Sequence, residues 1–160
     1  MPISSSTNSR TTVSAYLRAS PAGHSVSFFI PHDASYRTAC VASGVLCSFA
    51  YDLVIRKRLG GLNMSEFVML ETPLPVHSTR ILSLAEKYST CLSLSDRVFA
   101  KEWLLSLDQR SCNVAWRALW ALAPRRRLEL LAVFNAIVSR WYSLTDTDIE
   151  KVFEHCDWPL

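Results

Sequence analysis

Three stretches in the first half of the chain have the pattern of short β-strands: residues 11–18, 25–31 and 66–71. In the first stretch, apolar Val13, Ala15 and Leu17 alternate with polar neighbours, which is the period of a half-buried strand. Pro31 ends the second stretch, and the sequence PLP that starts at Pro73 closes the third. The hydrophobic pattern therefore predicts a small sheet before residue 72.

Between the second and third predicted strands, the apolar residues change to helical spacing. From Asp33 to about Lys57, this spacing is carried by Ala42, Leu46, Phe49 and Leu53. Asp33 is a candidate N-cap, and Gly60 and Gly61 are expected to form the helix exit because glycine adopts positive φ at little cost. The pattern predicts one long helix packed against the sheet.

Helical patterns dominate the rest of the chain, with helices expected at 79–87, 95–103, 106–124 and 125–144. The last of these has one apolar stripe that consists of Leu131, Phe134, Val138 and Trp141. Thr145 and Asp148 match a capping box for a final short helix. Strands followed by helices predict an α+β fold: a small mixed sheet with a long packed helix in the N-terminal half, residues 1–76, and a helical C-terminal half, residues 77–160.

Composition supports an ordered chain and places limits on its chemistry. Of the 160 residues, 49% are apolar, and the mean hydropathy of +0.14 argues against wholesale disorder. The net charge is only +3, so any affinity for nucleic acid must come from local clusters. The five cysteines form no CxxC pair, which favours buried, reduced thiols in a cytoplasmic protein over a disulfide scaffold or a zinc site.

The chain start does not have the pattern of a signal peptide, because MPISSSTNSR contains no apolar h-region. The longest apolar stretch runs from residue 38 to residue 55 and is interrupted by Ser43, Gly44, Ser48 and Asp52. A membrane-spanning helix needs about 20 mostly apolar residues. We therefore expect a buried helix here and no membrane partner.

The motifs of several enzyme classes are missing from the sequence. There is no GxxxxGK[ST], GxGxxG, GxSxG or HExxH motif, and the four histidines have no ligand spacing. Asp146 and Asp148 are two residues apart, but capping explains them better than a metal pair. The chain alone is therefore not expected to be an enzyme or to bind a cofactor.

The densest basic cluster is Arg56, Lys57 and Arg58, which Gly60, Gly61 and Asn63 follow closely. Cations favour the C-terminal dipole of a helix, and this explanation needs no ligand. A basic helix end beside a loop of small residues also lets a nucleic-acid backbone approach closely. For the second basic run, residues 125–127, a solvated face or an interdomain contact is the simpler explanation.

Residues 48–76, SFAYDLVIRKRLGGLNMSEFVMLETPLPV, resemble a recurrent segment in the target-recognition part of large adenine-N6 DNA methyltransferases. These are the type IIG restriction-modification enzymes and related phage-defence methylases. The sequence TNSRT at 7–11 is similar to their TNERT, and residues 127–153 resemble their C-terminal end. The positions that match within 48–76 are Phe49, Asp52, Arg56, Lys57, Gly60, Gly61, Phe67, Leu70, Leu74 and Pro75.

The sequence departs from the family in two ways. The glutamine usual between the arginine and lysine is missing, which leaves RKR, and the aromatic pair after the loop is replaced by Glu66 and Phe67. The [N/D/S]PP[Y/F] motif, which binds the flipped adenine in the family, is also missing, because no PP dipeptide occurs. The chain is not expected to methylate DNA by itself.

The resemblance implies a DNA target-recognition subunit or fragment that acts on double-stranded DNA with a catalytic methyltransferase or nuclease/helicase subunit. Its DNA-binding residues would be Arg56, Lys57, Arg58, Gly60, Gly61 and Asn63, with support from Asn8, Arg10 and Thr11. One alternative is a structural adaptor of a multi-subunit defence complex that does not bind DNA and uses its tryptophans as an interface. The other alternative is a decayed fragment without function.

Overall fold

The computed structural model describes residues 10–18, 21, 23, 26–33, 35–60, 64–75, 78–106 and 120–154. Its elements are α1 (Tyr36–Leu46), α2 (Phe49–Arg58), α3 (Glu66–Glu71), α4 (Thr79–Ser93), the short 3-10 helix η1 (Arg97–Phe99), α5 (Ala100–Ser106), α7 (Pro124–Trp141) and α8 (Asp146–Glu154). Within these described ranges there is no β-strand. The predicted α+β fold with a small mixed sheet is therefore wrong, and the described structure is helical.

None of the three stretches predicted as strands forms a paired β-strand. The stretch EFVMLE forms helix α3, in which the Ser65 hydroxyl accepts a hydrogen bond from the Val68 amide and caps the first turn. This stretch is too short and too apolar for its period to separate a strand from a helix. Residues 12–18 and 27–31 are extended, but neither pairs with another strand in the described part of the chain.

The long helix predicted from Asp33 to Lys57 is two helices. α1 ends at Leu46, α2 begins at Phe49, and the two axes are bent by 62°. The Ser48 side chain accepts a hydrogen bond from the Tyr51 amide and so starts the new helix. A serine that caps a helix is indistinguishable, by hydrophobic period alone, from a serine inside one.

The expected helix boundaries also differ. α1 begins at Tyr36, and Asp33 lies outside it, accepting hydrogen bonds from the Ser35 amide and the Thr38 hydroxyl. These two bonds lower the pKa of Asp33. α2 ends in an extended residue, Leu59, and Gly60 does not have a positive φ. The expected glycine exit is therefore wrong for Gly60, and Gly61 lies outside the described residues.

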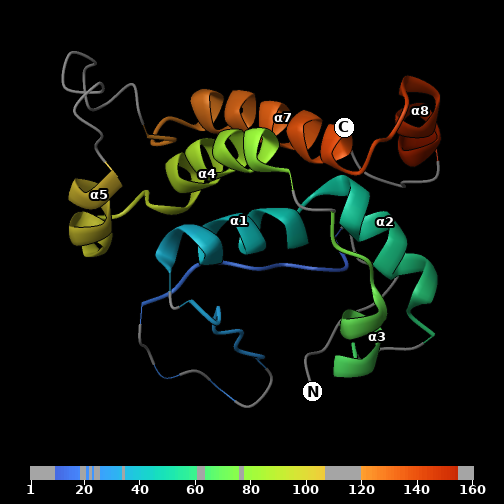
Figure 1. Ribbon diagram of the computed structural model, residues 1–160, viewed down its shortest axis with the longest axis horizontal. Helices are drawn as coiled ribbons and strands as arrows, with labels where there is room; N and C mark the ends of the chain where they lie inside the picture. Colours follow the sequence, from blue (N-terminus) through green and yellow to red (C-terminus); the bar gives the residue numbers. More distant parts are fainter. Residues whose placement is uncertain are drawn as a thin grey trace.

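The core consists of α4 packed between α1 and α7 (Figure 1). Its buried apolar residues are Val41, Val45, Ala85, Leu92, Ala121, Leu130, Phe134 and Val138. The ring of Phe134 on α7 reaches α1 at Gly44, where an added Cβ would lie 2.5 Å from Cζ of this ring. Only glycine leaves room for this ring without a shift of the packing.

The helix predicted at 79–87 extends to Ser93 as α4, and the stretch 95–103 contains η1 and part of α5. Most of the helix predicted at 106–124 lies outside the described residues, and residues 120–123 are not helical.

The helix predicted at 125–144 and the short helix after Thr145 are confirmed in their main features. α7 covers most of the expected range and buries Phe134 and Val138 from the predicted stripe. At the start of α8, the Thr145 hydroxyl accepts from the Asp148 amide, and Asp148 Oδ2 accepts from the Thr145 amide at 2.9 Å. This reciprocal pair is the predicted capping box. The pKa of Asp148 is lowered by its hydrogen bonds with Thr145.

No single helix among the described residues is long and apolar enough to cross a membrane. α1 and α2 taken together have the length and composition of a membrane-spanning segment, but their axes are bent by 62°.

Candidate nucleic-acid interface

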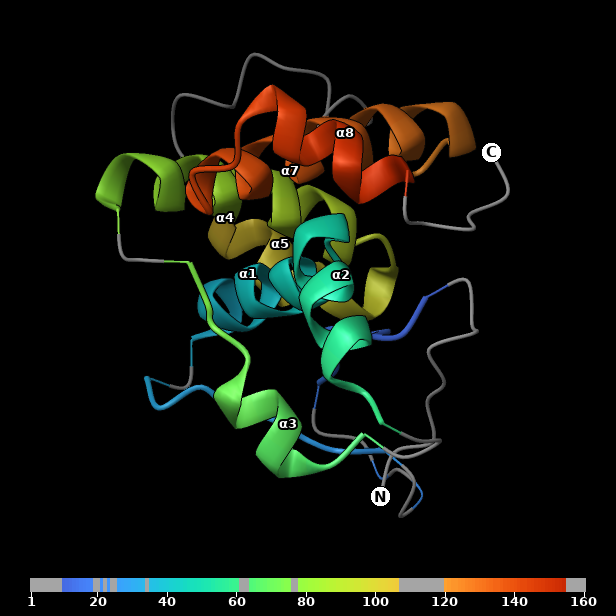
Figure 2. The same ribbon diagram turned by 90° about the vertical axis from the view of Figure 1, so that its right-hand side faces the viewer.

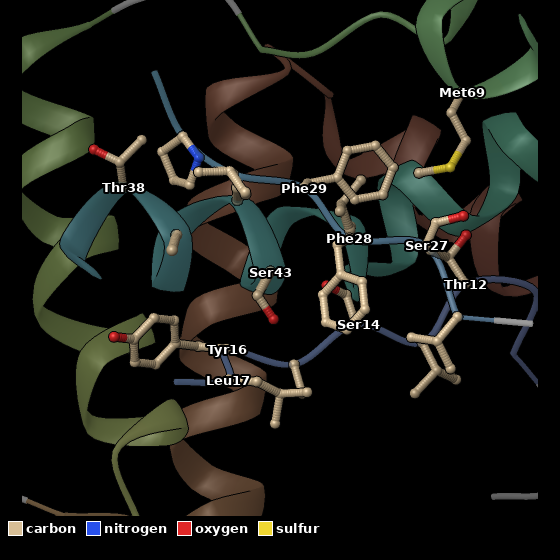
Figure 3. Close-up of a pocket in the computed structure, with 18 of the residues that line it drawn as sticks. Thr12, Ser14, Tyr16, Leu17, Ser27, Phe28, Phe29, Thr38, Ser43 and Met69 are labelled. Atoms are coloured by element: carbon tan, nitrogen blue, oxygen red, sulfur yellow. The ribbon is translucent and has the colours of Figure 1, made fainter. Parts of the chain in front are cut away.

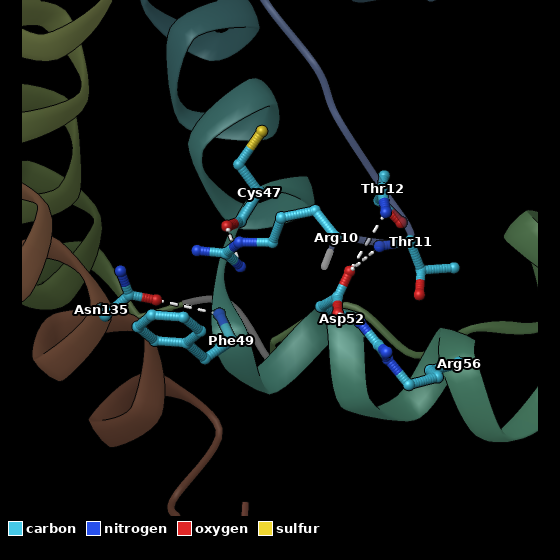
Figure 4. A network of polar contacts seen from close by, with 8 residues as sticks. All are labelled: Arg10, Thr11, Thr12, Cys47, Phe49, Asp52, Arg56 and Asn135. Carbon is cyan, nitrogen blue, oxygen red and sulfur yellow. Dashed lines mark hydrogen bonds and ion pairs between the residues drawn. The ribbon is translucent and has the colours of Figure 1, made fainter. Parts of the chain in front are cut away.

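A buried carboxylate at the start of α2 joins the N-terminal segment to this helix (Figure 4). Asp52 is fully buried, and its Oδ1 accepts hydrogen bonds from the amides of Thr11 at 2.7 Å and Thr12 at 3.1 Å. Its Oδ2 lies 2.9 Å from the guanidinium of Arg56, one turn further along α2. Because a buried charge is stable only when it is paired and hydrogen-bonded, these contacts fix the N-terminal segment against α2.

Phe49, the first residue of α2, is a second meeting point (Figure 4). The guanidinium of Arg10 lies 4.2 Å from the centre of its ring and also donates to the carbonyl oxygen of Cys47. The Phe49 amide donates to Oδ1 of Asn135 on α7, at 2.9 Å. Its ring also packs edge-on against Phe153 of α8, with 5.4 Å between centroids.

Three separate parts of the chain therefore converge at the start of α2. Residues 10–12 contribute the stacked guanidinium and the two amides, α2 contributes Phe49 and Asp52, and the α7–α8 region contributes Asn135 and Phe153. Each of the three belongs to, or directly adjoins, one of the stretches 7–11, 48–76 and 127–153, on which the expected family resemblance depends.

The Cys47 thiol holds the N-terminal segment at the corner between α1 and α2. Its sulfur accepts from the Ser14 amide at 3.1 Å and lies 3.2 Å from the Ser14 carbonyl oxygen, to which the thiol donates. Burial raises the pKa of Cys47, although the Ser14 amide and Arg10 act in the opposite direction. The neutral thiol that can donate is therefore the favoured form. Within the described ranges, no three His, Cys, Asp or Glu residues are grouped so that they could hold a metal ion.

The three cations at the end of α2 have different surroundings. The Arg56 side chain is only 15% exposed and is directed to Asp52. Arg58 is exposed and donates to the carbonyl oxygen of Glu71, the last residue of α3, at 2.7 Å. Lys57 is exposed, as is Gly60, where an added Cβ would meet nothing within 4 Å. The exposed positive charge of this cluster is therefore that of Lys57 and Arg58.

The structure brings together Arg10, Thr11 and Arg56 from the predicted set, around Asp52. Lys57, Arg58 and Gly60 lie at the far end of the same helix. The other predicted residues, Asn8, Gly61 and Asn63, lie outside the described residues.

Sequence reasoning gave no role to Asp52 or Asn135, although both hold this junction together. A signal for Asp52 was present: a single carboxylate inside a long apolar stretch, four residues before an arginine. Asn135 has no such signal, because its partner at the start of α2 is 86 positions away.

The second basic run lies at the start of α7, at the opposite end of the long axis from α2 (Figure 1). Arg125 and Arg126 form ion pairs with Glu129, and Arg127 donates to the carbonyl oxygen of Leu92. The basic run 125–127 therefore makes its contacts within the molecule, on a face of α7 that is partly exposed to solvent.

Comparison of the chain with family models, curated proteins and solved structures gave no match. The function of the chain is therefore inferred from its residues and their geometry.

Proposed function

We propose that this chain is a non-catalytic DNA target-recognition subunit or fragment of a restriction-modification or anti-phage defence DNA methyltransferase complex. The supporting observation is the junction at Phe49 and Asp52, where the three resembling stretches meet. Stretches that each resemble the same family need not be in contact with one another in the folded chain. Their contact at one place supports the interpretation that they form one inherited unit.

In this proposal, Lys57 and Arg58 contact the phosphates or base edges of double-stranded DNA, because both are exposed at the end of α2. Gly60 leaves open space beside them for the close approach of a backbone. Asn63 and Gly61 belong to the same proposed contact loop. Methylation or cleavage is the task of the partner, a catalytic methyltransferase or nuclease/helicase subunit.

In this proposal, the other predicted residues that the structure describes have a structural role, because they lie at or near the contacts of Asp52. Arg56 is directed into the molecule and orients the basic end of α2, while Arg10 and Thr11 brace its first turn. Asn8 precedes this brace and belongs to the same proposed support. Alanine at Arg56 would leave the buried Asp52 with its ion pair broken, so it would test stability as well as binding.

The test replaces Lys57 and Arg58 by glutamine and leaves Arg56 unchanged. The purified proteins are titrated with fluorescent duplexes of random sequence, and fluorescence anisotropy is measured over a range of salt concentrations. Each lost phosphate contact lowers the log–log salt slope by about 0.9, so the double variant should lose about two units. Circular dichroism checks that the variant remains folded.

A double variant of Arg125 and Arg126 to glutamine is the matched control, because it removes the same charge from the far end of the molecule. Its salt slope should equal that of the unchanged protein. The proposal is contradicted if the Lys57 and Arg58 variant, still folded, keeps the slope of the unchanged protein.

That result would favour the alternative function, a structural adaptor that binds protein and not DNA. An observation in its favour is the apolar exposed surface of the α3 region: Phe67, Leu70 and Leu74 are 66%, 76% and 64% exposed. The described tryptophans, in contrast, do not supply the interface expected for an adaptor, and Trp116 and Trp158 lie outside the described residues. Trp120 is buried against Trp103, and Trp141 packs on the core.

A further inference from the structure

A cavity of about 740 Å³ lies beside α1, between two extended parts of the chain. Residues 10–17 line one side of it, residues 26–31 line another, and Met64 and Met69 contribute from the α3 region. Figures 1 and 2 show both extended segments on the side of α1 that faces away from α4. Figure 3 shows Phe28 and Phe29 on one segment and Ser14 and Tyr16 on the other.

Along the first segment, buried and exposed side chains alternate as in a strand. The sequence predicted that the apolar side chains would face inward, but the polar ones do. Thr12, Ser14 and Tyr16 are buried or half-buried, whereas Val13 and Leu17 are 82% and 53% exposed. The hydrogen bonds explain this orientation, because the Thr12 and Ser14 amides donate to Asp52 and Cys47. The apolar face of this segment therefore points away from the protein.

The second segment exposes its apolar residues in the same way. Val26, Phe28, Phe29 and Ile30 are each more than half exposed, and Ile30 is 85% exposed. Exposed side chains that gather in one place, and are not scattered singly, mark interaction sites.

Most backbone groups of the two segments are also open; in residues 12–17 the Thr12 and Ser14 amides and the Ser14 carbonyl oxygen are bonded to side chains. Within the described ranges, no backbone–backbone hydrogen bond joins residues 12–17 to another segment, and Val26 alone in 26–31 makes one, to Gly23. The Thr12 hydroxyl is buried in the cavity wall and has no hydrogen-bond partner among the described residues. Extended backbone with open donors and acceptors is the template onto which another strand pairs.

We propose that residues 12–17 and 26–30 form an acceptor for one extended, apolar strand of a partner protein. The open amides and carbonyls at every second residue, Val13, Ala15 and Leu17, match a peptide backbone, whereas a small molecule needs a few convergent polar groups. Arg10 is the one charged residue among the described residues that line the cavity, and no carboxylate lines it. This charge disfavours a basic strand and favours a neutral or acidic one.

This inference concerns a protein partner and stands whether or not the chain binds DNA. The probe is a phage-displayed library of random octapeptides, because five or six paired residues extend about 17–20 Å. The purified chain is used for selection, and the best peptide is synthesised. Its dissociation constant is measured by fluorescence anisotropy, and amide hydrogen exchange is compared with and without the peptide.

The selected peptides should have apolar residues at every second position and few basic residues. Amides within 13–17 and 27–30, apart from that of Ser14, should exchange rapidly in the free chain and become protected when the peptide is bound. The double substitution Val13→Lys with Leu17→Lys should weaken binding at least tenfold, because edge charges oppose strand pairing. The matched control, Leu104→Lys with Leu128→Lys, changes two other residues that are each 68% exposed and should leave the dissociation constant unchanged.

Enrichment of no peptide, or of peptides without the alternating pattern, would overturn the proposal. Protection confined to other parts of the chain would do the same. Equal affinity of the unchanged protein and the Val13 and Leu17 variant would also overturn it. Protection of 12–17 in a self-associated chain without peptide would assign the acceptor to a second copy of this chain, against the proposal. No assay here contains DNA, so these outcomes are independent of the salt-slope test.

Discussion

The helical core and the side of the molecule formed by α3 and the extended segments are both rich in apolar residues, but only the core buries them. In the α1–α4–α7 packing, Phe134 is 2% exposed and Val138 is fully buried. On the other side, Ile30 is 85% exposed and Leu70 is 76% exposed. The two regions therefore differ in what covers them, and not in their content of apolar residues.

The two regions differ because helices and extended segments satisfy their backbone hydrogen bonds in different ways. A helix satisfies its own amides and carbonyls, so packing one apolar stripe on another completes the structure. An extended segment satisfies neither its backbone nor its outer face without a neighbouring strand. The core of this chain is complete within the chain, and the extended side is not.

A substitution at Asp52, which links the two regions, should cause the largest loss in the free energy of unfolding. Asp52→Ala removes the acceptor of two amides and the partner of Arg56, which is then left in a largely buried place. Breaking a buried pair in this way costs about 3–5 kcal/mol. Urea denaturation followed by circular dichroism gives the free energy of unfolding.

The control for this variant is Glu129→Ala, which breaks two exposed ion pairs on α7 and should cost less than about 1 kcal/mol. Equal costs for the two variants would mean that Asp52 does not hold the regions together.

Within the core, Gly44→Ala should show an intermediate effect. The new Cβ would lie 2.5 Å from Cζ of Phe134, and overpacking of this kind costs about 1–3 kcal/mol. Alanine is better than glycine inside a helix by up to about 1 kcal/mol, which offsets part of this loss. The same denaturation measurement should therefore show a net loss of about 1–2 kcal/mol.

Gly60→Ala is the matched control for Gly44, because its added Cβ meets nothing within 4 Å. Its free energy of unfolding should stay within about 0.5 kcal/mol of the unchanged protein. If Gly44→Ala is as stable as Gly60→Ala, the Phe134 ring does not limit this position.

The extended side should give the smallest effect on stability. Ile30→Ser removes a large apolar side chain that is 85% exposed, so the free energy of unfolding should change by no more than about 0.5 kcal/mol. Light scattering at increasing concentration should show less self-association, because the exposed apolar surface is smaller. A loss above about 2 kcal/mol would mean that Ile30 is packed in solution, and the contrast with the core would fail.

Sequence reasoning predicted α7 and the start of α8 well because their signals are local. The stripe that includes Phe134 and Val138, and the capping box of Thr145 and Asp148, lie within a few residues of one another. The same reasoning failed for residues 66–71, where a short apolar run fits a strand or a helix, and for Ser48, which starts a new helix in an apparently continuous pattern.

The candidate interface was only partly accessible from the sequence. The basic run and its glycines were visible, but the different surroundings of Arg56, Lys57 and Arg58 were not. Three neighbouring cations look alike along the chain. Their burial depends on which side of α2 faces the N-terminal segment and α3, and that is a tertiary property.

The sequence by itself determined where this chain is apolar, where α7 lies and how α8 is capped, because period and capping act over a few residues. Only the tertiary structure decided that the polar face of residues 12–17 turns inward and the apolar face outward. The physical reason is that the buried carboxylate of Asp52 and the thiol of Cys47 take the amides of this segment, from about 33 to 41 positions away along the chain.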